Sequence, residues 1–208
     1  MVRSNLAKVA ILSFLALSQF LPLLAEDKLS QAIELYDSKK YREAEAPLRE
    51  LLAEDPNNSR ARHTLGLVLM ELNNYGDAAT ELQKALEIGS ASDKLQVDLA
   101  RAYVELKDWD KAAAAVRAAE EIKSDNPDIP YYRGMIAASR KDYRAAAADF
   151  EKATELNPDH AYAHYYAGLA YNAMRRSDKT VQHFSIFLKL APDAPEAKKV
   201  ESLLRSLR

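Results

Sequence analysis

The chain contains no cysteine among its 208 residues, so disulfide bonds, thiolate catalysis and cysteine-based zinc sites are excluded. Glycine is also scarce. Its five positions are isolated from one another, and none belongs to a glycine-rich loop that could hold a phosphate. Neither sign of charge dominates, because the formal net charge is −2. Bulk electrostatics therefore gives no reason to expect nucleic acid as a partner.

The first 25 residues have the composition of an export signal. Arg3 and Lys8 supply a basic start, and Val9–Ala25 carries no charge. This pattern predicts a secretory signal peptide that is cleaved after Ala25, and hence an exported protein, periplasmic or secreted. The alternative is an uncleaved N-terminal helix that anchors the chain. The uncharged run of 17 residues is short for a membrane span, which needs about 20.

The rest of the chain repeats itself every 34 residues. Three columns of the repeat stand out, and each has one chemical character. The aromatic column is Tyr41, Tyr75, Trp109 and Tyr143. The small column is Ala32, Gly66, Ala100, Gly134 and Gly168. The large apolar column is Leu48, Leu82, Val116, Phe150 and Phe184. Because five copies stay in register, one repeating unit explains the pattern better than a set of unrelated helices.

These columns resemble the signature of the tetratricopeptide repeat. In the fourth copy the family's positions are held by Gly134, Ala146, Phe150, Ala153 and Pro158. The resemblance implies an all-α fold, an α-α superhelix or solenoid of five helix-turn-helix repeats, each with a helix A and an antiparallel helix B. The expected repeats are 25–58, 59–92, 93–126, 127–160 and 161–194. An amphipathic capping helix, 195–208, is expected to follow them.

Two features depart from the family pattern. The tryptophan that opens the signature is absent, and its column holds Lys28, Arg62, Gln96, Pro130 and His164. In addition, Pro47 lies well inside the expected helix B of the first repeat. An interior proline removes a backbone hydrogen bond and clashes with the preceding turn. We therefore expect a kink or a frayed start in that helix.

The sequence offers no constellation that could catalyse a reaction. His160 and His164 are four residues apart and could share a helix face with a metal ion, but no third ligand accompanies them. We interpret both as structural or surface side chains. Paired acidic residues such as Glu120 and Glu121 are expected on solvated faces of helix B. We predict no catalytic residue, no metal and no cofactor, and the chain is not expected to be an enzyme.

The remaining functional surface is the concave face, which in the resembled family is lined by helix A residues outside the packing columns. The family's best-known ligand mode grips a C-terminal carboxylate, but of the required basic and amide positions counted from the first repeat only Lys94 fits. Binding of that kind is not expected. The proposed protein- or peptide-binding face consists of Leu29, Ile33, His63, Leu67, Val97, Arg101, Tyr131, Tyr132, Met135, Tyr162, Tyr165, Tyr166 and Leu169.

Tyrosines concentrate in the last two repeats of this face. Tyrosine supplies a large rigid ring with a polar tip and is common where proteins touch. The same rings could instead fill space between neighbouring A helices, and both interpretations stay open at this point.

The sequence thus predicts an exported scaffold or adaptor that holds other proteins or peptides, in a setting such as bacterial cell-envelope complex assembly. The alternative is an accessory module that binds a small ligand or glycan in the tyrosine-rich groove. The basic capping helix also leaves peripheral contact with a membrane open. The sequence leaves the partner's identity and the oligomeric state undetermined.

Overall fold

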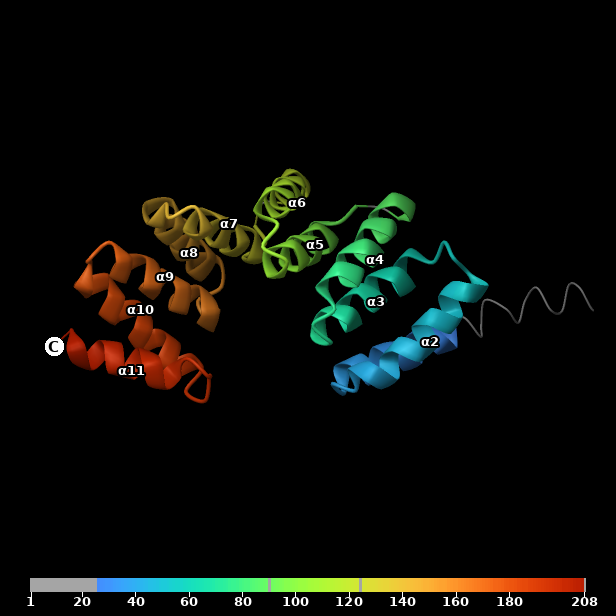
Figure 1. The fold of residues 1–208 in the computed structure, drawn as a ribbon, viewed down its shortest axis with the longest axis horizontal. Coiled ribbons are helices and arrows are strands. Elements are labelled where there is room, and N and C mark those ends of the chain that lie inside the picture. The colour runs from blue at the N-terminus through green and yellow to red at the C-terminus, as the bar shows by residue number, and fades with distance from the viewer. Residues whose placement is uncertain (1–25, 90, 124, 208) are drawn as a thin grey trace, which may run out of the picture. The chain divides into compact units, whose positions relative to one another are not determined.

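Figure 1 shows the computed structural model, in which residues 26–89, 91–123 and 125–207 are described. These residues form helices joined by short turns and contain no strand, as predicted. Helical residues 26–37 precede α2 (Tyr41–Glu54). The later pairs are α3 (Ser59–Glu71) with α4 (Tyr75–Ile88), α5 (Asp93–Glu105) with α6 (Trp109–Ile122), α7 (Asp128–Ser139) with α8 (Tyr143–Leu156), and α9 (Ala161–Ala173) with α10 (Ser177–Leu190). The last helix, α11 (Ala197–Ser206), packs against α10.

The predicted signal peptide, residues 1–25, lies outside the described residues. No helix within the described residues has both the length and the apolar character that a membrane span requires. The chain divides into two compact units, Met1–Ser90 and Ala91–Arg208. The first unit contains helical residues 26–37 and α2 to α4, and the second contains α5 to α11.

The small column explains why the two helices of a pair lie so close together. A β-carbon placed on Gly66 would stand 2.6 Å from Cγ of Leu82 on the partner helix, and one on Gly134 would stand 2.8 Å from Cε1 of Phe150. Both distances are too short for real contacts. The small residue of helix A therefore makes room for the large apolar residue of helix B, and each of these large residues is almost completely buried.

The turns between helix A and helix B share one backbone conformation. A residue with a positive φ between 58° and 62° stands in each turn, at Lys39, Asn73, Lys107, Lys141 and Arg175. The N–H of the following residue then bonds to the carbonyl five positions back, as Lys40 does to Leu35 at 2.8 Å and Asp108 to Tyr103 at 2.9 Å. This is the Schellman arrangement, in which glycine is the usual left-handed residue. Four of the five turns hold a basic residue there instead.

The helix that contains Pro47 has an ordered start. The N–H groups of Glu43 and Ala44 both donate to the carbonyl of Lys40 at 3.0 Å, and α2 runs from Tyr41 to Glu54. The frayed start expected from the sequence is therefore wrong, and the kink stays a prediction. Proline has no N–H, so the carbonyl of Glu43 lacks its usual intrahelical donor.

Candidate functional site

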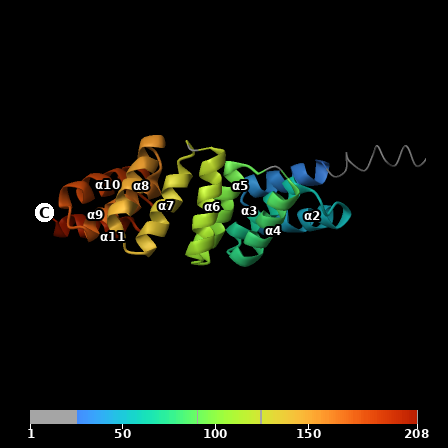
Figure 2. The same cartoon turned by 90° about the horizontal axis from the view of Figure 1, so that it is seen from above.

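The A helices of the second unit form one continuous side. Helix α7 contacts both α5 and α9, whereas α6, α8 and α10 do not contact one another within the described residues. Figure 2 shows α6, α7 and α8 following one another in chain order. Neighbouring A helices contact one another within this unit, whereas neighbouring B helices are farther apart. The A helices α5, α7 and α9 therefore line the inner face of the stack.

Five tyrosine rings form a continuous row over α7 and α9. Ring centroids are 5.0 Å apart for Tyr132 and Tyr131, 6.0 Å for Tyr131 and Tyr166, 5.1 Å for Tyr166 and Tyr165, and 6.2 Å for Tyr165 and Tyr162. These spacings lie in the range of favourable aromatic contacts, which prefer tilted or edge-to-face geometry. We call this set the tyrosine row.

Phenylalanines of α8 and α10 pack against rings of the tyrosine row. Phe150 stacks on Tyr166 at 5.6 Å and lies 6.0 Å from Tyr131, and Phe187 lies 5.1 Å from Tyr165. Both phenylalanines are almost completely buried. Tyr131, Tyr165 and Tyr166 are therefore packed against the hydrophobic core, which holds their rings in place before any ligand arrives.

The sequence-predicted face is divided between core and surface. Leu29, Val97 and Tyr165 are only 2%, 5% and 8% exposed, so they belong to the packing and offer a partner little side-chain surface. Tyr162 is exposed. The other predicted residues are half-buried, namely Ile33, His63, Leu67, Arg101, Tyr131, Tyr132, Met135, Tyr166 and Leu169. Leu29, Ile33, His63 and Leu67 belong to the first unit, and the second unit brings the remaining nine together.

The tyrosine row keeps its phenol groups neutral. Burial raises the pKa of Tyr131 and Tyr132 far above the usual value, and it also raises the pKa of Tyr166. The hydroxyl of Tyr162 donates a hydrogen bond to Oε2 of Glu196 at 3.2 Å. At neutral pH these rings are therefore uncharged donors and acceptors at the edge of an apolar surface.

His164 of α9 and His183 of α10 are buried and form a pair that the sequence did not indicate. Nδ1 of His164 lies 3.1 Å from Nδ1 of His183, and Nε2 of His164 lies 3.1 Å from the carbonyl oxygen of Pro158. That carbonyl can only accept, so Nε2 of His164 carries the hydrogen and Nδ1 of neutral His164 must accept. His183 then donates through Nδ1.

This assignment leaves Nε2 of His183 as an acceptor that faces another acceptor. It lies 3.7 Å from Oε1 of Glu151 and has no hydrogen-bond partner among the described residues. Burial lowers the pKa of both histidines, which favours the neutral pair. His160 and His164, whose spacing would allow them to share a metal ion, instead make separate contacts with the protein. His160 accepts from the N–H of Ala163 through Nδ1, and no group of three metal-ligating side chains occurs in the described part of the chain.

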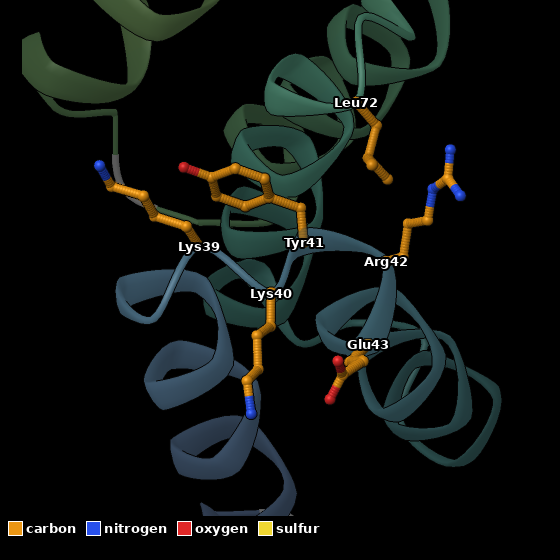
Figure 3. Close-up of a pocket in the computed structure, with 6 residues that line it drawn as sticks. All are labelled: Lys39, Lys40, Tyr41, Arg42, Glu43 and Leu72. Carbon is orange, nitrogen blue, oxygen red and sulfur yellow. The ribbon is translucent and has the colours of Figure 1, made fainter.

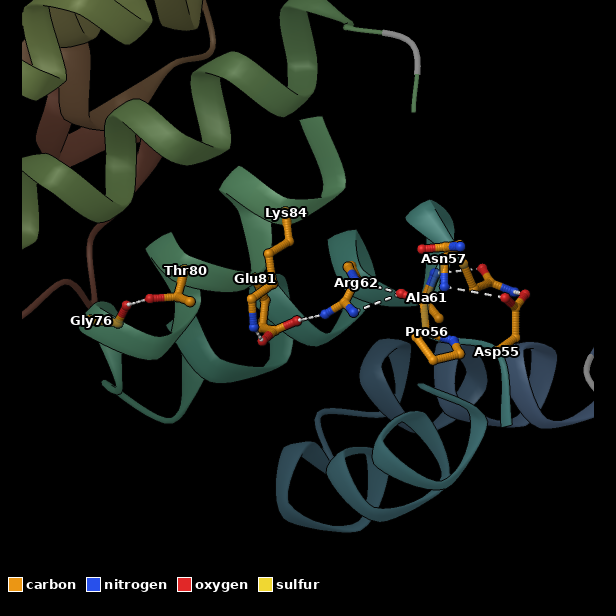
Figure 4. Close-up of polar contacts among 10 residues, drawn as sticks. Asp55, Pro56, Asn57, Ala61, Arg62, Gly76, Thr80, Glu81 and Lys84 are labelled. Atoms are coloured by element: carbon orange, nitrogen blue, oxygen red, sulfur yellow. Dashed lines mark hydrogen bonds and ion pairs between the residues drawn. The ribbon is translucent and has the colours of Figure 1, made fainter. Parts of the chain in front are cut away.

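An equivalent polar pair occurs in the second repeat, as Figure 4 shows. Arg62 donates from Nη2 to the carbonyl of Pro56 at 2.6 Å and pairs with Oε2 of Glu81 at 2.6 Å. Arg62 and His164 stand in the same column, and so do Glu81 and His183. Arg62 and His164 occupy the column in which the family signature has tryptophan. Each of them bonds both to the turn before its repeat and to a side chain of helix B.

Two cavities of about 390 Å³ lie beside the turns that join helix A to helix B. The one in Figure 3 is lined by Lys39, Lys40, Tyr41, Arg42, Glu43 and Leu72, and its charged side chains are all exposed. The other is lined by Arg144, Ala147, Ala148, Glu151, Tyr171, Met174 and Arg176. Glu151 in the second is already bound by Nζ of Lys179 at 2.9 Å. Neither arrangement resembles an acid–base or nucleophilic centre.

Comparison with known proteins identifies one kind of repeat over most of the chain. Family models for the tetratricopeptide repeat match residues 35–89, 69–139 and 131–195. No curated protein matches the sequence closely enough to count as a relative.

Solved structures show the same fold at low sequence identity. YrrB, described as a tetratricopeptide repeat protein with an unusual peptide-binding site, is 23% identical, with a TM-score of 0.63 over 84% of this chain and 90% of its own. PilF of Pseudomonas aeruginosa is 17% identical, with a TM-score of 0.73 over 88% and 86%. MamA of Desulfovibrio magneticus RS-1 is 16% identical, with a TM-score of 0.69 over 82% and 97%.

Proposed function

The chain belongs to the tetratricopeptide repeat family, and we propose that it is an exported scaffold that holds a segment of another protein on the tyrosine row. Members of this family generally mediate protein–protein interactions. The observation that carries the proposal is the continuity of the row, with five neighbouring rings on the inner face of a single compact unit. We propose a scaffold rather than a catalyst, in keeping with the family's usual role.

The physical properties of the row suit the binding of a peptide. A protein–protein interface gains most of its energy from a few aromatic anchors that lose water on binding. Rings that are already fixed by Phe150 and Phe187 lose little conformational freedom when a partner arrives. The half-exposed edges of Tyr132 and Tyr166 and the exposed ring of Tyr162 provide the contact area.

The proposed location rests on residues 1–25, whose basic start and uncharged run support export. A scaffold in that compartment could act in the assembly of a bacterial cell-envelope complex, and we include this role in the proposal. Its support is the combination of the export pattern with a repeat fold that presents an open binding face.

The proposal is tested with two surface tyrosines and a matched control. Tyr132→Ala and Tyr162→Ala are combined, since these side chains retain exposed area, whereas Tyr165 is part of the core. Arg60→Ala is the control, because Arg60 is exposed and stands at the position of Tyr162 in the second repeat. Partners enriched from the envelope fraction are identified by mass spectrometry, and thermal unfolding is followed by circular dichroism.

We expect the double variant to lose a partner that the wild-type chain and the Arg60 variant both retain, with little change in unfolding temperature. Unchanged enrichment together with a lower unfolding temperature would show that the tyrosines serve packing alone.

A small-ligand or glycan site is the second candidate, because the exposed ring of Tyr162 beside Glu196 could stack on a sugar and bond to its hydroxyl groups. Glycans that raise the unfolding temperature of the wild-type chain, and not of the Tyr162 variant, would favour it.

A further inference from the structure

Three charged side chains of α5 lie along one stripe of that helix. Asp98, Arg101 and Glu105 are spaced at i, i+3 and i+7, which places them on the same side. Helix α5 contacts α7, and the charges of all three residues act on the hydroxyl of Tyr132. Glu105 also acts on Tyr131 and Tyr166. The stripe therefore borders the tyrosine row on the side of α5.

Two further carboxylates lie beside the tyrosine row. Asp128 is in the first turn of α7, where its Oδ1 lies 3.4 Å from Nε2 of His160, and the His160 ring is 4.7 Å from the ring of Tyr131. At the other end, Glu196 accepts the hydrogen bond of Tyr162. Carboxylates thus lie near the Tyr131 and Tyr132 end of the row and at Tyr162.

The sum of these charges is negative. Five charged side chains, those of Asp98, Arg101, Glu105, Asp128 and Glu196, act on the hydroxyl groups of the row, and their formal charges sum to −3. The face of each aromatic ring carries additional negative charge density, and it attracts an arginine or lysine placed over it. The partly apolar surroundings strengthen both attractions relative to water. An anionic segment would be repelled by these carboxylates.

We propose that the tyrosine row binds a cationic segment of another protein, in which arginine or lysine side chains are interspersed with apolar or aromatic residues. The apolar side chains lie on the half-exposed rings together with Met135 and Leu169. The basic side chains reach the carboxylates of Asp98, Glu105, Asp128 and Glu196. This inference rests on the proposed function, because it names the chemistry of the segment held at the same site.

Three labelled peptides of equal length test the charge preference. The first alternates arginine with leucine around a central tryptophan, and the second and third replace every arginine with glutamine or with glutamate. Binding to the full chain is measured by fluorescence anisotropy at about 50 mM and about 300 mM salt, because screening weakens contacts between exposed charges. We expect the arginine peptide to bind about tenfold more tightly than the glutamine peptide at low salt and to lose most of this advantage at high salt.

Variants of the chain test whether the preference for the arginine peptide arises at the tyrosine row. Glu105→Gln combined with Glu196→Gln is expected to weaken binding of the arginine peptide about threefold to tenfold and to leave the glutamine peptide unaffected. The matched control combines Glu121→Gln with Glu201→Gln, which removes the same charge from exposed positions on α6 and α11. This control is expected to bind all three peptides as the wild-type chain does.

The outcomes separate this inference from the proposed function. If the glutamine or glutamate peptide binds at least as tightly and the Tyr132 and Tyr162 variants abolish that binding, the row binds peptides but the cationic preference is wrong. If no peptide binds, the inference falls, and the enrichment experiment decides whether the proposed function falls with it. If sedimentation shows that the tyrosine variants abolish self-association instead, the occupant is a second copy of this chain and the inference is overturned.

Discussion

The second and fifth repeats stand 102 residues apart, have the same backbone plan and differ in their polar side chains. Both place a glycine against a large apolar residue, Gly66 against Leu82 and Gly168 against Phe184. Both join the preceding turn to helix B through a polar pair. The second repeat uses a charged arginine and glutamate, whereas the fifth uses two histidines. The positions that hold the tyrosines of the fifth repeat differ as well, since Arg60, His63 and Thr64 of the second repeat correspond to Tyr162, Tyr165 and Tyr166.

This comparison shows which parts of the repeat are fixed and which are free to vary. The contact between small and large residues cannot change without separating the helices. The column of the absent tryptophan holds arginine in the second repeat and histidine in the fifth, each bonded to the carbonyl of the preceding proline and to a side chain of helix B. Of the equivalent helix A positions, Arg60 and Tyr162 are both exposed, whereas His63 is half-buried and Tyr165 is buried.

The largest difference is expected from truncation of the large apolar residue. Phe184→Ala should lower the free energy of unfolding by about 3–5 kcal/mol, and Leu82→Ala by about 2–5 kcal/mol. Because Phe184 also lies 6.2 Å from the ring of Tyr165, only its truncation should reduce the tyrosine signal in near-ultraviolet circular dichroism. Equal loss of that signal in both variants would contradict the idea that Phe184 supports the tyrosine row.

Acidification should affect the fifth repeat before the second. The pKa of His164 and of His183 is lowered from 6.5, mainly by burial, so the folded chain binds fewer protons than the unfolded chain. Stability is therefore lost as the pH falls below about 6.5, by at most about 1.36 kcal/mol per pH unit for each histidine. Glu151 beside Nε2 of His183 offsets part of the loss, because it favours the protonated ring, whereas the charge of Lys179 opposes protonation.

The pair in the second repeat responds at lower pH. Burial alone would raise the pKa of Glu81, but hydrogen bonds from Lys84 and Arg62 lower it below 4.5 overall. Its contribution is lost only as the pH falls below about that value. Urea unfolding at pH 7, 6 and 5 should show a decline for the wild-type chain and a smaller decline for the double variant His164→Gln, His183→Gln. An identical decline in both chains would place the sensitivity elsewhere.

The first repeat can be converted to resemble the second. Pro47 stands in the column of Glu81 and His183, and Lys28 stands in the column of Arg62 and His164. Pro47→Ala should raise the free energy of unfolding by about 1–2 kcal/mol, because it restores the hydrogen bond to Glu43. Pro47→Glu should restore the same bond and add a carboxylate on α2, where Nζ of Lys28 already lies 2.7 Å from Oε1 of Glu54. Thermal unfolding of both variants checks this, and a neutral or negative effect would mean that a bend at Pro47 belongs to the fold.

The smallest effect is expected in the turns. Arg175 and Asn73 both have left-handed backbone, with φ of 58° and 60°. Asparagine tolerates this conformation better than arginine does. Arg175→Gly should therefore stabilise the chain by about 0.5–1 kcal/mol, and Asn73→Gly should change stability by only a few tenths. Equal changes in unfolding temperature for the two variants would show that the side chain at this position is not strained.

The fold could be predicted from sequence because each packing column depends on side-chain size, and size repeats visibly at Gly66, Gly134 and Phe150. The left-handed residue of each turn could not be predicted, since lysine gives no signal for positive φ. The pairing of His164 with His183 could not be predicted either. His164 stands where the family signature has a tryptophan, and its partner is 19 positions away, so no local pattern links the two residues.

The site could be predicted only in part. Tyr162 and Tyr165 are close in sequence and both aromatic, yet Tyr162 is exposed and Tyr165 is covered by Phe184 and Phe187. Periodicity assigns both to helix A but does not distinguish a ring on the inner surface from a ring between neighbouring helices.

Site-specific photo-crosslinking in intact cells shows whether helix A of the fifth repeat binds a protein at the tyrosine row and the equivalent positions of the second repeat do not. A photoreactive phenylalanine analogue is placed at Tyr162 or at Arg60, two exposed positions that are equivalent in the repeat. We expect a discrete crosslinked partner from position 162, reduced by Tyr132→Ala, and none from position 60. A partner crosslinked equally from both positions, or from position 60 alone, would contradict this expectation.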